Sequence, residues 1–231
     1  MTGAGRPARP VRPALSREYI IRTALELIDR DGLAALSMRK LGAELRTDPM
    51  AVYHHLPNKA ALFDGVVEAM YTEIEFTPHP DRSWRDELGM FMRAMRAVLR
   101  RHPNALPVIS TRPAYSPTMM RVGEVAMQRL TAAGFSTAEA LDVTNCLGVF
   151  TIGHALAEVG EPVGGAHATP EDMRARLSAT EHPNLIKIFA EGYEYQPDRQ
   201  YESGLTALLD GFELRLAVVS RPGDPARTSP R

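Results

Sequence analysis

Apolar side chains recur at helical spacing along most of the chain, and this pattern predicts an all-α fold. The first helix is expected from about Arg17 to Asp31, with Ser16 as its N-cap and Gly32 as its left-handed stop. Its apolar stripe consists of Ile20 or Ile21, Ala24, Leu25 and Ile28. The one β-like run, 106–110, is too short to predict a strand.

Two helix starts and a tight turn follow close together. Ser37 can N-cap a second helix that ends at Leu45, and Asp48, followed by a proline at the first helical position, can N-cap a third. Only Arg46 and Thr47 separate these two helices. Such a short helix-turn-helix projects its second helix outward, as a helix that reads the major groove of DNA must.

Further helices are predicted along the rest of the chain. Asn58 can cap a fourth helix that runs to about Phe76, where the sequence Thr-Pro-His-Pro ends it and marks the best domain boundary. Ser83, with Asp86 three residues on, resembles a capping box that opens a fifth helix. Later helices are expected at about 117–133, at about 137–159 behind the capping box of Ser136 and Glu139, and at about 182–192 and 198–219.

The pattern divides the chain into four parts. Residues 1–15, in which three arginines alternate with prolines, are expected to form a disordered basic arm, which is either a solvated tail or an arm that reaches along a DNA groove. Residues 16–76 form a helix-turn-helix domain with its connecting helix, 83–220 form a second helical domain, and 221–231 form a flexible tail.

The charge of the chain is uneven. The net charge of −1 conceals a value of +4 over residues 1–60, which hold 10 Lys and Arg against 6 Asp and Glu, while the remainder holds 17 against 22. The basic end coincides with the helix-turn-helix. The acidic remainder discourages DNA from binding elsewhere on the molecule.

Other classes of protein find little support in the sequence. It shows no nucleophile–base pair, phosphate loop or metal-ligand spacing, so we expect no enzyme, no metal and no cofactor. No apolar run approaches the roughly 18–20 residues of a membrane span. The single cysteine, Cys146, lies among Asn145, Leu147 and Val149 and is expected to be a small buried hydrophobe in a cytoplasmic protein.

The stretch from Val52 to Leu62, Val-Tyr-His-His-Leu-Pro-Asn-Lys-Ala-Ala-Leu, resembles the DNA-binding domain of the tetracycline-repressor (TetR) family. Val52 is the expected core anchor of the reading helix. The resemblance is strong over residues 16–76 and continues, more weakly, beyond them. It implies a dimer that binds double-stranded DNA through the predicted helix-turn-helix.

The resemblance also implies which residues contact DNA. Arg39 should reach a guanine edge or a phosphate, although a solvated helix charge is the alternative. Phosphate contacts are implied for Tyr53 and Lys59, the latter at a helix start whose amides attract anions. The full set is Arg39, Lys40, Met50, Ala51, Tyr53, His54, His55 and Lys59. Met50 and Ala51 are apolar, so they can pack on a thymine methyl but donate no hydrogen bonds.

The longest predicted helix and the last one both carry apolar stripes with interior glycines. TetR members dimerise through these two helices as a four-helix bundle. Carried over to this chain, that interface comprises Phe150, Leu156, Leu205, Leu209, Phe212 and Leu216. The alternative is that the stripes belong to the core of a single chain.

The second domain resembles the tetracycline-repressor subgroup in its Thr111-Arg112-Pro113 and Phe150-Thr151-Ile152-Gly153 segments. The positions that hold the drug and its magnesium in that subgroup fall here on Val108 or Ile109, on Ala157 and on Phe91, so those ligands are missing. A methionine-rich lining suits a small apolar effector of irregular shape. The expected lining, for which plain core packing is the alternative, is Leu88, Phe91, Met92, Met95, Ile109, Thr111, Met120, Met127, Leu141, Thr144, Asn145 and Gly148.

The sequence thus predicts a ligand-responsive transcriptional regulator, of the kind that usually represses, which binds a palindromic operator as a homodimer. The alternative is a helical small-molecule-binding or adaptor protein that does not bind an operator.

Overall fold

The computed structural model describes residues 14–112, 117–160 and 169–219. These residues form helices and connecting loops without a β-strand, which confirms the all-α prediction. The N-terminal arm, apart from its last two residues, and the C-terminal tail lie outside the described residues. The helices are α1 (Arg17–Asp31), η1 (Leu33–Ala35), α2 (Met38–Leu45), α3 (Pro49–His55), α4 (Lys59–Thr72), α5 (Trp84–Arg101), η2 (Pro103–Ala105), α6 (Leu106–Thr111), α7 (Pro117–Ala133), α8 (Thr137–Val159), α9 (Pro170–Ala175), α10 (Pro183–Ala190) and α11 (Pro197–Val219).

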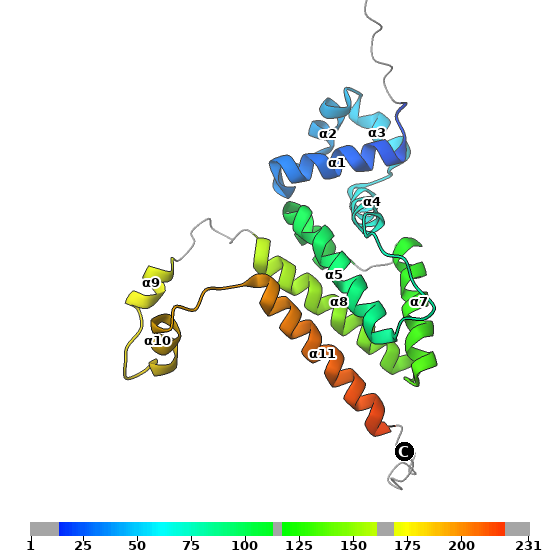
Figure 1. Ribbon diagram of the computed structural model, residues 1–231. Coiled ribbons are helices and arrows are strands. Elements are labelled where there is room, and N and C mark those ends of the chain that lie inside the picture. Colours follow the sequence, from blue (N-terminus) through cyan, green and yellow to red (C-terminus); the bar gives the residue numbers. More distant parts are fainter. Residues whose placement is uncertain (1–13, 113–116, 161–168, 220–231) are drawn as a thin grey trace, which may run out of the picture.

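The helices form a small N-terminal unit and a larger body (Figure 1). Helices α1, α2 and α3 make up the small unit, and α4 leads from it to the body of α5, α6, α7, α8 and α11. Helices α9 and α10 stand away from the body on one side. In the small unit and the adjoining α4, the side chains of Ile20, Ile28, Leu41, Val52 and Leu62 are fully buried.

Local capping explains where the helices begin. Ser16 accepts a hydrogen bond from Tyr19 N–H at the start of α1, and serine or asparagine side chains cap α2, α4 and α5 in the same way. Asp48 caps α3, with proline at its first position, as predicted. The Ser136 and Glu139 capping box is present at the start of α8. These contacts depend only on residues close in sequence, so the sequence predicts them well.

The turn between α2 and α3 is compact. Arg46 adopts the left-handed conformation, with φ of 50° and ψ of 47°, which is uncommon for a residue other than glycine. The N–H groups of Arg46 and Thr47 donate to the carbonyls of Ala43 and Gly42. A Cβ atom on Gly42 would lie 3.1 Å from Pro49 Cγ, so this glycine allows the two helices to approach closely.

One helix ends earlier than predicted, and one segment to which the sequence assigned no element is helical. Helix α4 ends at Thr72 instead of about Phe76, and the Phe76 ring packs edge-on against Phe91 of α5, with centroids 5.3 Å apart. The apolar run at 106–110 is helical and lies in α6, because Pro107 suits the first turn of a helix and Leu106 and Ile109 are buried in the body.

Helix α8 is long and apolar enough to cross a membrane by length and composition alone, contrary to the prediction that no segment approaches a span. The central helix of a folded domain meets the same criterion. Helix α8 packs against α5, α7 and α11, and Val143, Leu147 and Ala155 are buried among them. Cys146 lies on the outward side of α8 and is exposed, so the prediction of a buried cysteine was wrong.

A buried ion network joins α5, α8 and the start of α11. Arg96 donates to Glu158 Oε2 from Nε at 3.0 Å and from Nη2 at 2.7 Å, and Arg96 Nη1 lies 2.9 Å from Asp198 Oδ1. The side chains of Arg96 and Glu158 are 8% and 4% exposed. His154 lies beside them, and burial together with the Arg96 charge lowers its pKa, which favours the neutral imidazole.

Candidate DNA-binding and effector-binding sites

Helix α3 has one buried side and one exposed side. Val52 is fully buried, as predicted for the core anchor, and Leu56 just after the helix is 1% exposed. On the other side Met50 is 64% exposed and Tyr53 is 38% exposed, and both histidines of the helix are exposed. Ala51 is half-buried. The helix therefore offers the groove of DNA a face that combines apolar, phenolic and imidazole groups.

The two lysines of the predicted DNA set have different surroundings. Lys59 is exposed at the first position of α4, where its Nζ lies 3.5 Å from the Leu36 carbonyl and 5.3 Å from the centroid of the Phe63 ring. Lys40 Nζ instead lies 2.8 Å from Asp31 Oδ2. Hydrogen bonds from Arg30 and from Lys40 lower the pKa of Asp31 to about 2. Lys40 therefore pairs with a carboxylate, whereas Lys59 contacts a backbone carbonyl and pairs with no carboxylate among the residues that the structure describes.

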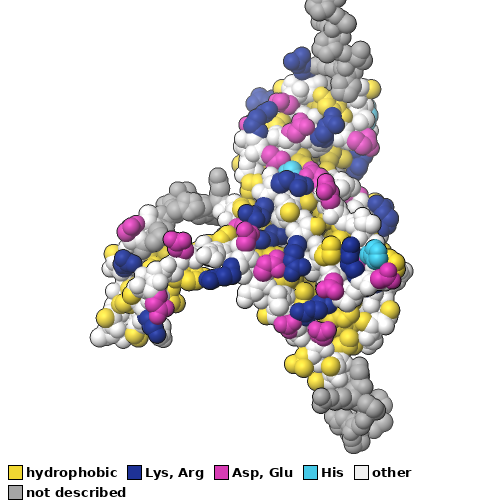
Figure 2. All heavy atoms as spheres, viewed as in Figure 1, with side chains coloured by type: hydrophobic (Ala, Val, Ile, Leu, Met, Phe, Trp, Pro, Cys, Tyr) yellow, Lys and Arg dark blue, Asp and Glu magenta, His cyan; other side chains and the backbone are white. Residues whose placement is uncertain are grey.

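Arg39 is exposed on α2 and forms no ion pair with any other residue that the structure describes. In the face shown by Figure 2, Lys and Arg side chains are interspersed with Asp and Glu over both the N-terminal unit and the body. This view shows no unbroken basic surface.

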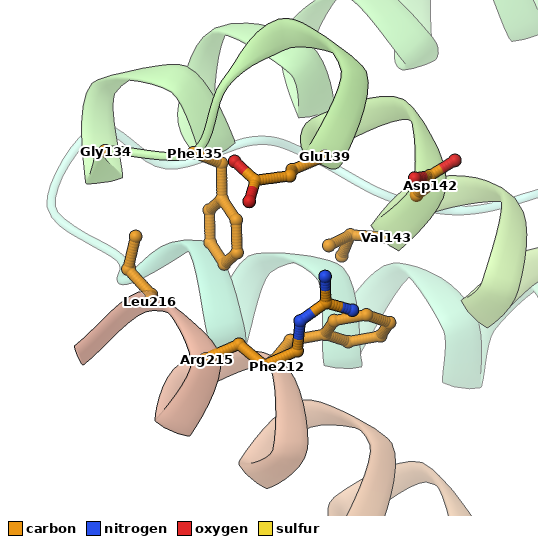
Figure 3. A pocket seen from close by; sticks show the side chains of 8 residues that line it. All are labelled: Gly134, Phe135, Glu139, Asp142, Val143, Phe212, Arg215 and Leu216. Atoms are coloured by element: carbon orange, nitrogen blue, oxygen red, sulfur yellow. The ribbon is translucent and has the colours of Figure 1, made fainter. Parts of the chain in front are cut away.

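The body contains a cavity of about 530 Å³ between α4, α5, α6, α7 and α8. The structure places ten of the predicted lining residues on its wall: Leu88, Phe91, Met92, Met95, Ile109, Met127, Leu141, Thr144, Asn145 and Gly148. The other two lie elsewhere, because the Thr111 hydroxyl donates to the Pro107 carbonyl at 2.7 Å and Met120 is 60% exposed. A smaller hollow between Phe135, Val143 and Phe212, shown in Figure 3, has room of only about 10 Å³ and cannot hold an effector.

Several lining residues were not predicted. Helix α7 faces the cavity with Met119, Val122, Gly123 and Ala126, a stripe with helical spacing that the sequence contains but that begins one residue before Met120. The lining also includes four polar residues that the prediction omitted: Glu87, Ser110, Arg112 and Arg129. Nothing in the sequence pattern indicates that these four residues border the cavity.

Two of the lining residues connect the cavity to α4. Tyr71 belongs to α4 itself, and burial raises its pKa to about 12, so its phenol stays protonated. Arg112 Nε donates to Asp64 Oδ1 at 2.7 Å, and Arg112 Nη2 donates to the Ala60 carbonyl at 3.1 Å. A molecule in the cavity would thus contact side chains that belong to α4 or hold it.

This arrangement of a helix-turn-helix unit joined to a helical body with an apolar cavity also agrees with known proteins. The family model for bacterial regulatory proteins of the tetR family matches residues 20–66, and the model for the tetracyclin repressor-like C-terminal domain matches residues 77–216. The chain belongs to the TetR family. It is a transcriptional regulator with an N-terminal DNA-binding helix-turn-helix and a C-terminal ligand-binding domain.

Individual TetR-family relatives cover most of this regulator. An HTH-type transcriptional regulator of Saccharopolyspora erythraea is 33% identical over 206 residues, which span 87% of this chain and 86% of the relative. The tetracycline repressor protein class C of Escherichia coli is 34% identical over 208 residues, 88% of this chain and 94% of the relative. The structure of Streptomyces coelicolor ActR in complex with actinorhodin superposes with a TM-score of 0.77 at 28% identity, over 88% of this chain and 99% of that one.

Proposed function

We propose that this TetR-family regulator represses transcription by binding a palindromic operator as a homodimer, and that an apolar effector in the cavity releases it. The observation that carries the proposal is the contact between the cavity wall and α4, through Tyr71 and through Arg112 bonded to Asp64. Helix α4 begins directly after the reading helix. A ligand that moves α4 would change the separation of two reading helices on successive turns of DNA, about 34–36 Å apart.

An exposed apolar stripe on α8 and α11 supports the homodimer. Val149 is 72% exposed and Leu156 40% exposed on α8, while Leu214 is 67% and Val218 60% exposed on α11. Large apolar side chains gathered on one surface are typical of a protein interface. From the predicted interface we omit Leu205 and Leu209, because both are buried within a single chain, and we retain the half-buried Phe150, Phe212 and Leu216 at its edge.

The cavity supports an effector that binds without a metal ion. Its wall is made mainly of methionine, aromatic and aliphatic side chains, with Thr144 and Asn145 as polar anchors. The neighbour ActR was crystallised with actinorhodin, and we therefore take actinorhodin as the first probe. Tetracycline with Mg²⁺ is the matched comparison, because the resemblance places the positions that would hold that metal on Val108 or Ile109 and on Ala157. Addition of Mg²⁺ should leave ligand affinity unchanged.

Operator binding is tested by a gel shift on the DNA upstream of the gene that encodes the chain, at two salt concentrations. Specific binding by a dimer, with release by actinorhodin, is the expected result. If the purified dimer retards no DNA from this region and selects no sequence from a random duplex pool, the operator proposal is wrong and the protein is an adaptor.

Lys59→Ala is expected to weaken binding to every DNA sequence and to lower the slope of log affinity against log salt by about one, because it removes one phosphate contact. Lys187→Ala on α10 is the matched control, since Lys187 is 73% exposed and far along the chain from the helix-turn-helix. Affinities measured by fluorescence anisotropy at several salt concentrations test this role. A Lys59→Ala protein with an unchanged slope but lost sequence preference would contradict it.

Gly148→Leu is expected to abolish actinorhodin binding while operator binding persists. A Cβ atom on Gly148 would meet no other atom within 4 Å, and Gly148 lines the cavity, so a larger side chain there has room to begin and occupies ligand space. Ala138→Leu, at the exposed start of the same helix, is the control. Titration calorimetry measures ligand affinity. Equal affinities for Gly148→Leu and the unchanged protein would remove this cavity as the effector site.

A further inference from the structure

His102 lies where the C-terminal body meets the DNA-binding unit. It follows the last residue of α5, and its side chain is 11% exposed. Its Nδ1 lies 2.8 Å from Asp29 Oδ2, and its Nε2 lies 3.0 Å from Glu73 Oε2. Asp29 belongs to α1, and Glu73 is the C-cap of α4. One imidazole thus joins three helices across the boundary between the two parts of the molecule.

The charge state of the ring decides how many of these contacts are hydrogen bonds. A carboxylate only accepts hydrogen bonds, and a neutral imidazole has one N–H to donate, whereas the protonated ring has two. Both carboxylates can therefore be satisfied by His102 only when its ring is protonated. Histidine is the side chain that ordinarily changes charge between about pH 5 and 8.

The groups around the ring do not replace the hydrogen bond between His102 and the Asp29 carboxylate. Arg101 Nη2 also lies 3.0 Å from Glu73 Oε2, and Asn104 Nδ2 donates to the Asp29 carbonyl at 2.9 Å. Burial acts to raise the pKa of Glu73, but hydrogen bonds from His102 and Arg101 outweigh it and lower that pKa. The Asp29 Oδ1 atom is buried without a hydrogen-bond partner among the described residues, so the Asp29 carboxylate relies on His102.

We propose that His102 is a charge-dependent link that holds α1 and α4 of the DNA-binding unit against the body. The protonated ring bonds both carboxylates and fixes the angle between the two parts. The neutral ring donates to only one of the two carboxylates and turns an unprotonated nitrogen toward the other, which loosens the contact and frees the N-terminal unit to move. The link makes the rigidity of the DNA-binding unit, and through it operator affinity, depend on pH; only this second consequence rests on the operator binding proposed above.

Hydrogen exchange in the free, full-length protein tests the link without DNA. Protection factors, corrected for intrinsic exchange, are measured for the amides of α1 and α4 at about pH 6 and about pH 8.5. In the unchanged protein we expect protection at the junction to fall about 10-fold as the pH rises, the size of one lost charge-assisted hydrogen bond. His102→Gln should show the lower protection at both pH values.

Two further variants separate the link from general effects of mutation. Glu73→Gln keeps the shape of one partner but removes its charge, and it should also lose the pH dependence. His79→Gln is the matched control, because His79 is half exposed in the loop before α5 and should behave like the unchanged protein. If the protection factors of His102→Gln fall with rising pH as much as those of the unchanged protein, the proposal is overturned. If His102→Gln does not fold, equal protection at both pH values in the unchanged protein overturns it.

The affinity of the same proteins is then measured for the operator that the unchanged chain selects. His54 and His55 on the reading helix are present in every variant, so their contribution is the same on both sides of the comparison. We expect His102→Gln to bind about 10-fold more weakly at pH 6 and equally at about pH 8.5. Loss of all DNA binding in the unchanged protein, with the exchange result intact, would refute operator binding but leave the His102 link standing.

Discussion

Leu214→Arg is expected to leave the protein monomeric and to weaken operator binding by about 100-fold or more, the largest functional effect that the structure suggests. Leu214 is 67% exposed on α11, among the exposed apolar residues that we assign to the interface. A charged side chain there would be desolvated without a partner when two chains meet, which opposes association. A monomer then binds each half-site separately and loses the gain from binding both at once.

The measurement is sedimentation equilibrium together with fluorescence anisotropy on the full operator and on a single half-site. Half-site affinity should be unchanged, since Leu214 lies far from the helix-turn-helix. Met120→Arg is the control, because Met120 is similarly exposed, at 60%, but lies on α7. A Leu214→Arg protein that remains a dimer with normal operator affinity would rule out this stripe as the interface.

Glu158→Ala is expected to lower the free energy of unfolding by about 3 kcal/mol, because it leaves a buried arginine without its main partner. Glu158 accepts two hydrogen bonds from Arg96 and also lies 3.2 Å from Arg100 Nε. Asp198 remains beside Arg96, but the Asp198 side chain is 72% exposed and its charge is screened by water. Glu158→Gln retains a hydrogen-bond acceptor and should lose less stability.

Urea unfolding at a fixed protein concentration gives the comparison, since a dimer gains stability with concentration. Glu202→Ala is the matched control: Glu202 also pairs with an arginine of α5, Arg93, but both side chains are about half exposed, at 44% and 45%. That exposed pair should contribute about 1 kcal/mol or less. If both variants lose the same free energy of unfolding, burial does not determine how much the Arg96–Glu158 pair contributes to stability.

The sequence by itself determined the helices and the identity of the DNA-reading unit. Ser16, Ser37, Asp48 and Asn58 mark helix starts, because a cap is a contact between residues two or three positions apart. The helix-turn-helix can be predicted for the same reason. Its turn, its buried anchor Val52 and its exposed face all depend on residues of one short segment.

Only the tertiary structure decided which apolar residues face the core, the cavity or the surface. Tyr201, Leu205 and Leu209 are buried because α11 packs tightly on the body, where a Cβ atom on Gly204 would lie 2.5 Å from the ring of Phe150. Cys146, four residues before Phe150 on the same helix, is nevertheless exposed. Helical spacing gives the relative positions of side chains around one helix, but the direction in which each stripe points depends on contacts between helices distant in sequence.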